Sequence, residues 1–481
     1  MNTKRILTLV LALLMVFSLT ACGGNGEEEV EIIEQIEYVS GESQSGEQTG
    51  NQTGNQTGNQ TGNQAGNQTG NQSSNTGVDL AKLKGTTVRF ATWKDPALNE
   101  DGIVVNSFED KYGIKVQVDI IGEGEYTKKI QGYIASGKNI PDIYFANGTY
   151  PACLKNLQPI DAMKLDLNDP IWDKTFSKFF TIDGKTYMVN TVSNIWNETD
   201  MLYYNKNVLQ KAGISNPDTY IQGLIDSNKW NFDTFTSLMN TVKTSLGTGG
   251  TPAYMDVYAI TCSTGANWFT HDNGKFTASL DDKLIDVSKQ ITTWKSQGLV
   301  SMVHGEMSMF INDKMAFAIT NAFGLKKTGY FGGDNVFGGK KMDPNNIGFT
   351  YIPDFSASRK SVAAGMTRGY GLCKGAPNPL GAGVFLRYYL DVNNYDISSA
   401  FISDKASDFF FKLTTPDRLA SQNLYQITGL ALLKSDLTSS VYDIIENSPN
   451  QVDAFVRSRV NNFNSIAKEI NGIVANDLMQ R

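Results

Sequence analysis

The chain has 481 residues, too many for one ordinary core and about right for two large lobes or three small domains. Hydrophobic residues make up 40% and charged residues 19%, a globular composition that excludes a wholly disordered chain. The net charge is -7, but eight Glu and no base lie between residues 23 and 78, so the remainder is nearly neutral. A neutral body argues against a nucleic-acid partner. Four Cys and two His are too few for most metal or catalytic clusters, so we expect no metal and no cofactor.

The start of the chain has the features of an export signal. Two basic residues precede an apolar run over residues 6–19, which is shorter than the roughly 20 residues that a membrane span needs. The run ends in L-T-A-C at Cys22, which resembles a bacterial lipobox. The resemblance implies that residues 1–21 are a signal peptide and that Cys22 is lipidated. A plain signal peptide followed by a chance cysteine is the alternative.

Residues 22–84 are predicted to be a tether without chemistry of its own. An acidic patch is followed by the tetrad N-Q-T-G, which runs five times over residues 51–70 with Ala65 replacing one Thr. Such a polar, repetitive sequence cannot bury a core, so we expect a flexible spacer. As a coil it spans roughly 40 Å, taking about 5–6 Å times the square root of its length.

From Gly85 the hydrophobic pattern alternates between the periods of strand and helix. Residues 87–91, 114–120 and 142–146 are predicted strands, and the helical stripes between them end at Gly113 and Gly137. A strand-helix-strand-helix-strand run predicts a parallel, doubly wound sheet, and hence an α/β fold. Apolar residues recurring over 452–474 predict a long amphipathic helix near the end of the chain.

Six segments in chain order resemble the extracellular solute-binding proteins of family 1, the sugar-binding components of ABC importers. These segments are 108–116, 134–145, 156–161, 183–190, 201–214 and 309–323. The chain departs from the family pattern at Asn190, where proline is usual, and at Asn321 and Phe323, where Gly and Trp are usual. An insertion-like stretch, residues 196–200, precedes the family element at residues 203–206.

The resemblance implies two doubly wound α/β lobes joined by a three-crossing hinge, the type II periplasmic-binding-protein arrangement. The expected first lobe covers 86–190 and 364–432, and the second covers 191–363 and 433–481. The expected crossings lie near 189–191, 361–367 and 431–435. Lobe closure is then a hinge motion, which a ligand can bias only by binding the closed form better than the open one.

A neutral sugar requires aromatic planes for its C–H faces and planar polar groups for its hydroxyls. Ligands of doubly wound sheets lie beyond the carboxyl ends of the strands. In the first lobe this rule selects Trp93, Lys94, Asp95, Asn147 and Tyr150. In the second lobe and at the crossings we expect ligand contacts from Asn194, Trp196, Glu198, Asn267, Trp268, Asn321, Phe323 and Arg368.

Several of these residues also have a structural alternative. Trp93 and Trp268 could be core residues, although Trp268 resembles a stacking position of the family. Asp95 before Pro96 could cap a turn. Arg368 could tie the lobes together instead of clamping hydroxyls.

The sequence contains few signals for catalysis. The sequence lacks G-x-S-x-G, G-x-x-x-x-G-K-[ST], H-E-x-x-H and C-x-x-C. His271 is predicted to be a solvated turn residue beside Asp272, and His304 a structural or exposed one. After lipidation of Cys22 three cysteines remain, so no full disulfide framework forms, and Cys262 and Cys373 are predicted buried thiols.

The sequence therefore predicts a protein with no catalytic residue, anchored by lipid on the extracytoplasmic face of the cell membrane. We expect a monomer that captures a carbohydrate, an oligosaccharide in our interpretation, and delivers it to an ABC permease. A surface glycan-acting hydrolase is one alternative, since its two carboxylates are always available among 49 acidic residues. The other is a sensor or binding lipoprotein for another polar solute.

Overall fold

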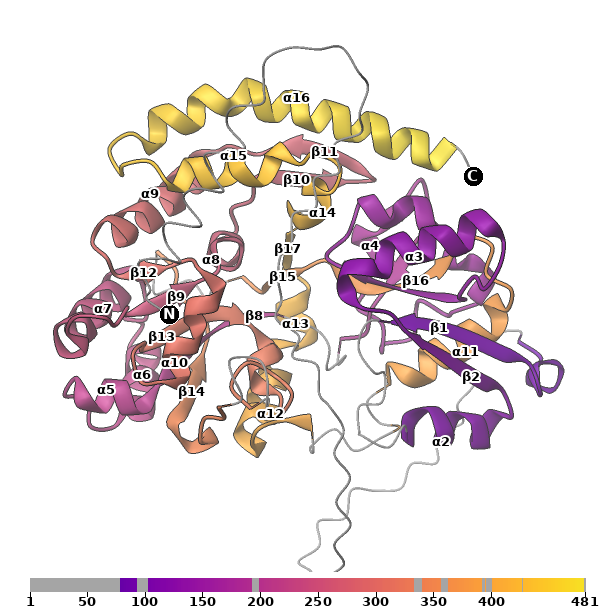
Figure 1. The fold of residues 1–481 in the computed structure, drawn as a ribbon, viewed down its shortest axis with the longest axis horizontal. Helices are drawn as coiled ribbons and strands as arrows, with labels where there is room; N and C mark the ends of the chain where they lie inside the picture. The colour runs from indigo at the N-terminus through magenta and orange to yellow at the C-terminus, as the bar shows by residue number, and fades with distance from the viewer. Residues whose placement is uncertain are drawn as a thin grey trace, which may run out of the picture. The chain divides into compact units, whose positions relative to one another are not determined.

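The computed structural model describes most of the chain from residue 78 onward, and all of these residues belong to the compact unit Gln48–Arg481. The described ranges are 78–92, 103–192, 199–332, 340–355, 362–391, 394, 400–425 and 427–479. The expected signal peptide, Cys22 and most of the expected tether lie outside these ranges. Two β-sheets with helices packed around them form the body (Figure 1).

The first sheet has the strand order β2-β1-β3-β16-β4, and β7 also pairs with β16. Strands β1, β2 and β3 are parallel, whereas β16 is antiparallel to β3, β4 and β7. The strands are β1 (Thr87–Thr92), β2 (Lys115–Ile120), β3 (Ile143–Asn147), β4 (Leu157–Gln158), β7 (Met188–Val189) and β16 (Arg368–Cys373).

The helices α2 (Ile103–Tyr112) and α3 (Glu123–Ser136) connect the parallel strands and confirm the predicted strand-helix alternation. Gly113 and Gly137 follow these helices with φ of 65° and 66°, a left-handed conformation that favours glycine. The sheet differs from an all-parallel one at β16, which returns from a distant part of the sequence and was not foreseen.

The second sheet has the order β12-β9-β13-β8-β14. Strand β13 is parallel to β9 and antiparallel to β8. Strand β8 is buried along its whole length, so Tyr203 and Tyr204 both lie in the core. The strands are β8 (Asp200–Asn205), β9 (Ala253–Met255), β12 (Val300–Ser301), β13 (Phe317–Asn321) and β14 (Ile347–Thr350).

Helices and short turns complete both halves of the body. Around the second sheet lie α5 (Lys206–Lys211), α6 (Pro217–Asp226), α7 (Phe232–Leu246), α8 (Val257–Ser263), α9 (Asp282–Ser296), α10 (Ser308–Ile311) and the 3-10 helices η4 (His304–Met307), η5 (Ala322–Leu325) and η6 (Pro344–Asn346). The remaining elements are η1 (Leu80–Leu83), η2 (Ala152–Asn156), η3 (Ile160–Met163), α4 (Lys174–Phe179), β5 (Thr181–Ile182), β6 (Lys185–Thr186), α11 (Pro379–Tyr389), α13 (Pro416–Leu419), α14 (Ile427–Ala431) and α15 (Asp436–Ile445).

The long C-terminal helix α16 (Val452–Met479) confirms the predicted amphipathic helix. It packs on α9 and α15, on the hairpin of β10 (Phe269–Asp272) and β11 (Lys275–Ala278), and on η2, which follows the first sheet's strand β3. A single hydrophobic cluster therefore includes buried residues of both sheets, such as Phe90 and Ile319.

A short parallel ribbon connects the two sheets. Strand β15 (Ala364–Met366) pairs with β17 (Asn423–Tyr425), and both contact α8 beside the second sheet. Thr199, just before β8, forms a β-bridge with Gly365 of the ribbon. Two residues after β15, the chain enters β16 of the first sheet at Arg368.

One stretch differs from the expected lobe boundaries, which placed all of 364–432 in the first lobe. Helix α12 (Asp404–Leu413) packs against η5 and β14 of the second sheet. Its apolar face, Ala406, Phe410 and Leu413, is buried in a cluster with Tyr203 and Phe310. This i, i+4, i+7 stripe needs an apolar partner, and the second sheet provides one.

Within the ranges given above, no helix combines the length and the apolar character needed to cross a membrane. Cys153, Cys262 and Cys373 are buried and form no disulfide among the described residues, which confirms the prediction that Cys262 and Cys373 are buried thiols. Burial raises the pKa of the Cys262 and Cys373 thiols well above the ordinary value, so both are unreactive core groups.

Candidate functional site

Asn147 and Arg368 meet at the carboxyl end of a strand in the first sheet. Asn147 ends β3, Arg368 begins β16, and the two are register partners. The Asn190 side-chain amide donates a hydrogen bond to the Arg368 carbonyl oxygen at 3.1 Å, so the segment after β7 is fastened at the same place. The Arg368 guanidinium carbon lies 6.0 Å from the centre of the Phe145 ring, and Arg368 is only 8% exposed.

Asn321 and Phe323 lie together at the corresponding end of β13 in the second sheet. Asn321 is the register partner of Asp200, which begins β8. Its side-chain oxygen accepts from the Phe323 backbone N–H at 3.1 Å, and its carbonyl oxygen accepts from the Tyr203 hydroxyl at 2.9 Å. The half-buried Phe323 ring meets Tyr330 edge-on at 5.1 Å. The strand end thus presents an amide and an aromatic ring side by side.

Asn267 is attached to the ribbon between the sheets. Its side-chain nitrogen donates to the side-chain oxygen of Asn423 at 3.2 Å. The Asn423 side-chain nitrogen donates in turn to the carbonyl oxygens of Cys262 and Ala266, at 3.1 and 2.9 Å. Sequence reasoning did not single out Asn423, because nothing local marks an asparagine whose partners lie more than 150 residues away.

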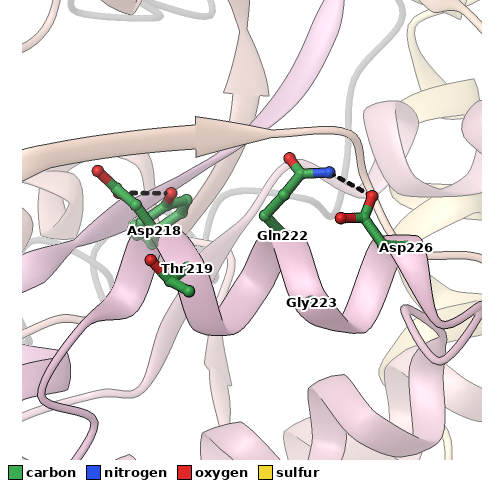
Figure 2. A pocket seen from close by; sticks show the side chains of 6 residues that line it. Asp218, Thr219, Gln222, Gly223 and Asp226 are labelled. Carbon is green, nitrogen blue, oxygen red and sulfur yellow. Dashed lines mark hydrogen bonds between the residues drawn. The ribbon is translucent and has the colours of Figure 1, made fainter.

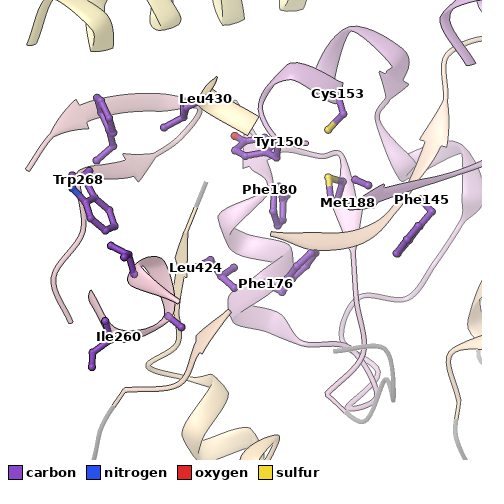
Figure 3. Close-up of a cluster of buried hydrophobic side chains, with 14 of the residues drawn as sticks. Phe145, Tyr150, Cys153, Phe176, Phe180, Met188, Ile260, Trp268, Leu424 and Leu430 are labelled. Carbon is purple, nitrogen blue, oxygen red and sulfur yellow. The ribbon is translucent and has the colours of Figure 1, made fainter. Parts of the chain in front are cut away.

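Trp268 and Tyr150 are buried, with exposed fractions of 1% and 0% (Figure 3). Trp268 lies edge-on to Tyr258 at 5.5 Å, which is the core packing weighed above as the alternative. The Tyr150 hydroxyl is hydrogen bonded to His271 Nε2 at 2.7 Å, and its ring meets Phe180 edge-on at 4.6 Å. In this conformation neither ring has a free face for a ligand, so their predicted ligand contacts require a change of packing.

The prediction that His271 is a solvated turn residue is wrong. His271 lies in β10, half-buried against Tyr150, Phe179 and Phe276. Burial lowers its pKa to about 4, with Asp272 opposing the shift. The turn itself follows Asp272, where Asn273 and Gly274 both have positive φ and join β10 to β11. His304 is half-buried beside Tyr254 and Tyr330, and burial lowers its pKa as well.

Six of the predicted ligand residues and the lipidation site lie outside the described residues, and their roles remain predictions. They are Trp93, Lys94, Asp95, Asn194, Trp196, Glu198 and Cys22. In the part of the chain that is described, no group of three or more His, Cys, Asp or Glu is arranged to hold a metal ion.

A separate hollow of about 500 Å³ lies on helix α6 (Figure 2). Its lining includes Asp218, which accepts hydrogen bonds from the Tyr204 hydroxyl at 2.8 Å and from the Lys206 ammonium at 2.7 Å. Gln222 donates to Asp226 at 2.7 Å. These carboxylates have protein partners, and none of the predicted ligand residues lines the hollow, so it is not the candidate site.

Two α/β sheets linked by a ribbon, with polar and aromatic residues where strands end beside the linking segments, define a two-lobed binding protein of the type II periplasmic class. The sequence matches the family of bacterial extracellular solute-binding proteins over residues 84–392, and the chain belongs to that family. This is a family of binding proteins that act outside the cytoplasm.

Solved structures with a similar fold come from several bacteria. The GacH receptor of Streptomyces glaucescens has a TM-score of 0.57 and 16% identity, covering 79% of this chain and 98% of that one. A cyclic alpha-maltosyl-1,6-maltose binding protein from Arthrobacter globiformis has a TM-score of 0.56 and 14% identity, covering 81% and 99%. The sugar-binding protein MalE from Xanthomonas citri has a TM-score of 0.56 and 15% identity, covering 81% and 98%. Identities this low show a shared fold alone. A comparison with curated protein sequences gave no match.

Proposed function

We propose that this protein captures a saccharide between its two lobes, an oligosaccharide in our interpretation, and delivers it to an ABC permease. The observation that carries the proposal is the family match over residues 84–392. The similar structures support the ligand class, because one was solved in complex with acarbose and another is named for cyclic alpha-maltosyl-1,6-maltose. In this proposal the protein is a monomer tethered through a lipid on Cys22, on the extracytoplasmic face of the membrane.

The chemistry at the two strand ends suits a sugar. Arg368 and Asn147 offer planar donors and acceptors that can pair with neighbouring hydroxyls. Phe323 offers a half-buried ring to a C–H face, with the Asn321 amide beside it. The protein catalyses nothing in this account, since its work is to bind the ligand more tightly in the closed form than in the open one.

The proposal is tested by titrating the mature protein with a panel of neutral oligosaccharides, using calorimetry and tryptophan fluorescence. We expect saturable binding and unchanged sugar afterwards. Arg368→Gln and Phe323→Ala should each weaken binding more than about tenfold, which is roughly 1.4 kcal/mol. Asn464→Ala, at an exposed position of α16, is the control and should bind as the wild type does.

Two outcomes would count against the proposal. Release of new reducing ends would identify a hydrolase. Absence of binding to every glycan offered, by a folded protein, would remove the saccharide as the ligand class.

A further inference from the structure

Three aromatic rings and an arginine gather where helix α12 packs on strand β14, and the arginine comes from helix α13, which follows α12 along the chain. The Phe409 ring of α12 lies 5.2 Å from that of Phe349 in β14 and 5.4 Å from that of Tyr351, the residue after β14's end. All three side chains are half-buried, whereas their neighbour Phe410 is fully buried in the core. Both helices lie beyond residue 392, where the family match ends, whereas Phe349 and Tyr351 lie within the match.

Arg418 of α13 stacks on this cluster without a charge partner. Its guanidinium carbon lies 4.5 Å from the centre of the Tyr351 ring. Its Nε is buried with no hydrogen-bond partner, and its side chain forms no hydrogen bond or ion pair with any described residue. Burial lowers the pKa of Arg418, and no described carboxylate is close enough to oppose that shift. Arg418 is half-buried, and partial burial of a cation without an anion nearby costs free energy.

Arg387 shows how this protein pairs another half-buried guanidinium. Its nitrogens contact Asp169 at 2.9 Å and Asp391 at 2.7 Å, and these carboxylates raise its pKa. Arg418 has the opposite shift because it has no such acid. A carboxylate from a ligand would give Arg418 the kind of partner that Arg387 has in Asp169 and Asp391.

The cluster adjoins the candidate site along the chain. Four residues after Arg418, Gln422 donates to the buried Asp173 that caps α4 beside the first sheet, at 2.8 Å. The next residue, Asn423, holds the predicted ligand residue Asn267. Arg418 therefore lies between the second sheet and the ribbon that joins the two lobes.

We propose that Arg418, Tyr351 and Phe409 form a subsite for a sugar residue that carries a carboxylate, such as a uronic acid. This inference rests on the proposed function and narrows its ligand class. The guanidinium presents parallel N–H donors that match a carboxylate, and the aromatic rings match the C–H face of a pyranose. A neutral sugar would leave the positive charge of Arg418 unmatched.

The test compares oligogalacturonides of two to four residues with malto-oligosaccharides of the same lengths, by calorimetry on the mature protein. We expect the uronates to bind at least tenfold more tightly than the neutral sugars. Arg418→Gln should remove this preference by lowering the affinity for the uronates at least tenfold. Arg418→Lys, which keeps the charge without the planar fork, should retain part of the preference, and circular dichroism checks that both variants fold.

Arg459→Gln is the matched control, because Arg459 also stacks on a ring, that of Phe455 at 4.7 Å, but has Asp443 at 3.6 Å as its partner. It should bind both classes as the wild type does. Neutral sugars binding as tightly as uronates would overturn the inference and leave the proposed function standing. A uronate preference that survives both Arg418 variants would also overturn it. Binding of neither class would remove the proposed function itself.

Discussion

The Asn423 side chain makes three hydrogen bonds at the junction of the lobes. It accepts a hydrogen bond from Asn267 and donates to the carbonyl oxygens of Cys262 and Ala266. We expect Asn423→Ala to lower the free energy of unfolding by about 2 kcal/mol, because it leaves three polar groups without their partner. Urea denaturation followed by circular dichroism measures the change.

The Asn423→Asp variant tests whether the stabilisation comes from the hydrogen bonds that Asn423 donates or from the shape of its side chain. The carboxylate has nearly the same shape, but it cannot donate to two carbonyl oxygens, so we expect a loss similar to that of the alanine variant. Asn464→Ala on the exposed side of α16 is the control and should stay within about 0.5 kcal/mol of the wild type. If Asn423→Asp is as stable as the wild type, the two donated bonds do not stabilise the fold.

Among single residues, those at strand ends were the most predictable. Asn147 lies where the hydrophobic pattern of the predicted strand 142–146 stops, a signal contained in a few neighbouring residues, whereas Asn321, which ends β13, was selected through the family pattern. Asn423 and Arg418 were not found, because their importance depends on partners that only the folded chain brings close. For the same reason, the sequence could not decide whether Trp268 is buried. A tryptophan that follows small residues is equally compatible with a core position and with a binding site.

At the scale of whole elements, local periodicity predicted the first three strands, the two helices between them and α16. It did not predict that β16 joins the first sheet as an antiparallel strand. Nor did it place α12 on the second sheet. Both contacts join segments that are far apart in the sequence. The hydrophobic period of a segment predicts its secondary structure but not the segment against which it packs.

The hairpin of β10 and β11 is an element whose contacts depend on pH. His271 is half-buried and neutral at pH 7, with a pKa of about 4 against an ordinary value near 6.5. The unfolded chain therefore takes up a proton at His271 before the folded chain does. Stability from this residue is complete above pH 6.5 and is lost as the pH falls from about 6.5 towards 4.

We expect His271→Gln to remove this dependence. Between pH 7.5 and 5, the free energy of unfolding of the wild type should fall by about 2 kcal/mol more than that of the variant. Urea denaturation at several pH values measures both, and the titration of other groups cancels in the difference. Parallel curves for the two proteins would mean that His271 is protonated as readily in the folded state as in the unfolded one.

At the scale of the whole molecule, the hydrophobic core runs through both sheets without a break. The hairpin joins Tyr150 beside the first sheet to helix α16, through the His271 bond and through Asn471, which pairs with Phe276 at 2.7 and 2.8 Å. Helix α16 in turn packs on α9 of the second sheet. Unfolding one half would therefore expose apolar surface of the other, and we expect a single cooperative transition.

Two single-tryptophan variants test this expectation, one retaining Trp172 and the other Trp294. Trp172 forms a β-bridge with Thr191 beside the first sheet, and Trp294 packs between Phe232 and Phe235 beside the second. In each variant, the urea midpoint reported by fluorescence should coincide with the midpoint from circular dichroism of the same variant, even where the substitutions lower overall stability. A fluorescence midpoint that differs from the circular dichroism midpoint of the same variant would show that the lobes unfold independently. The contacts through the hairpin and α16 would then be too weak to couple them.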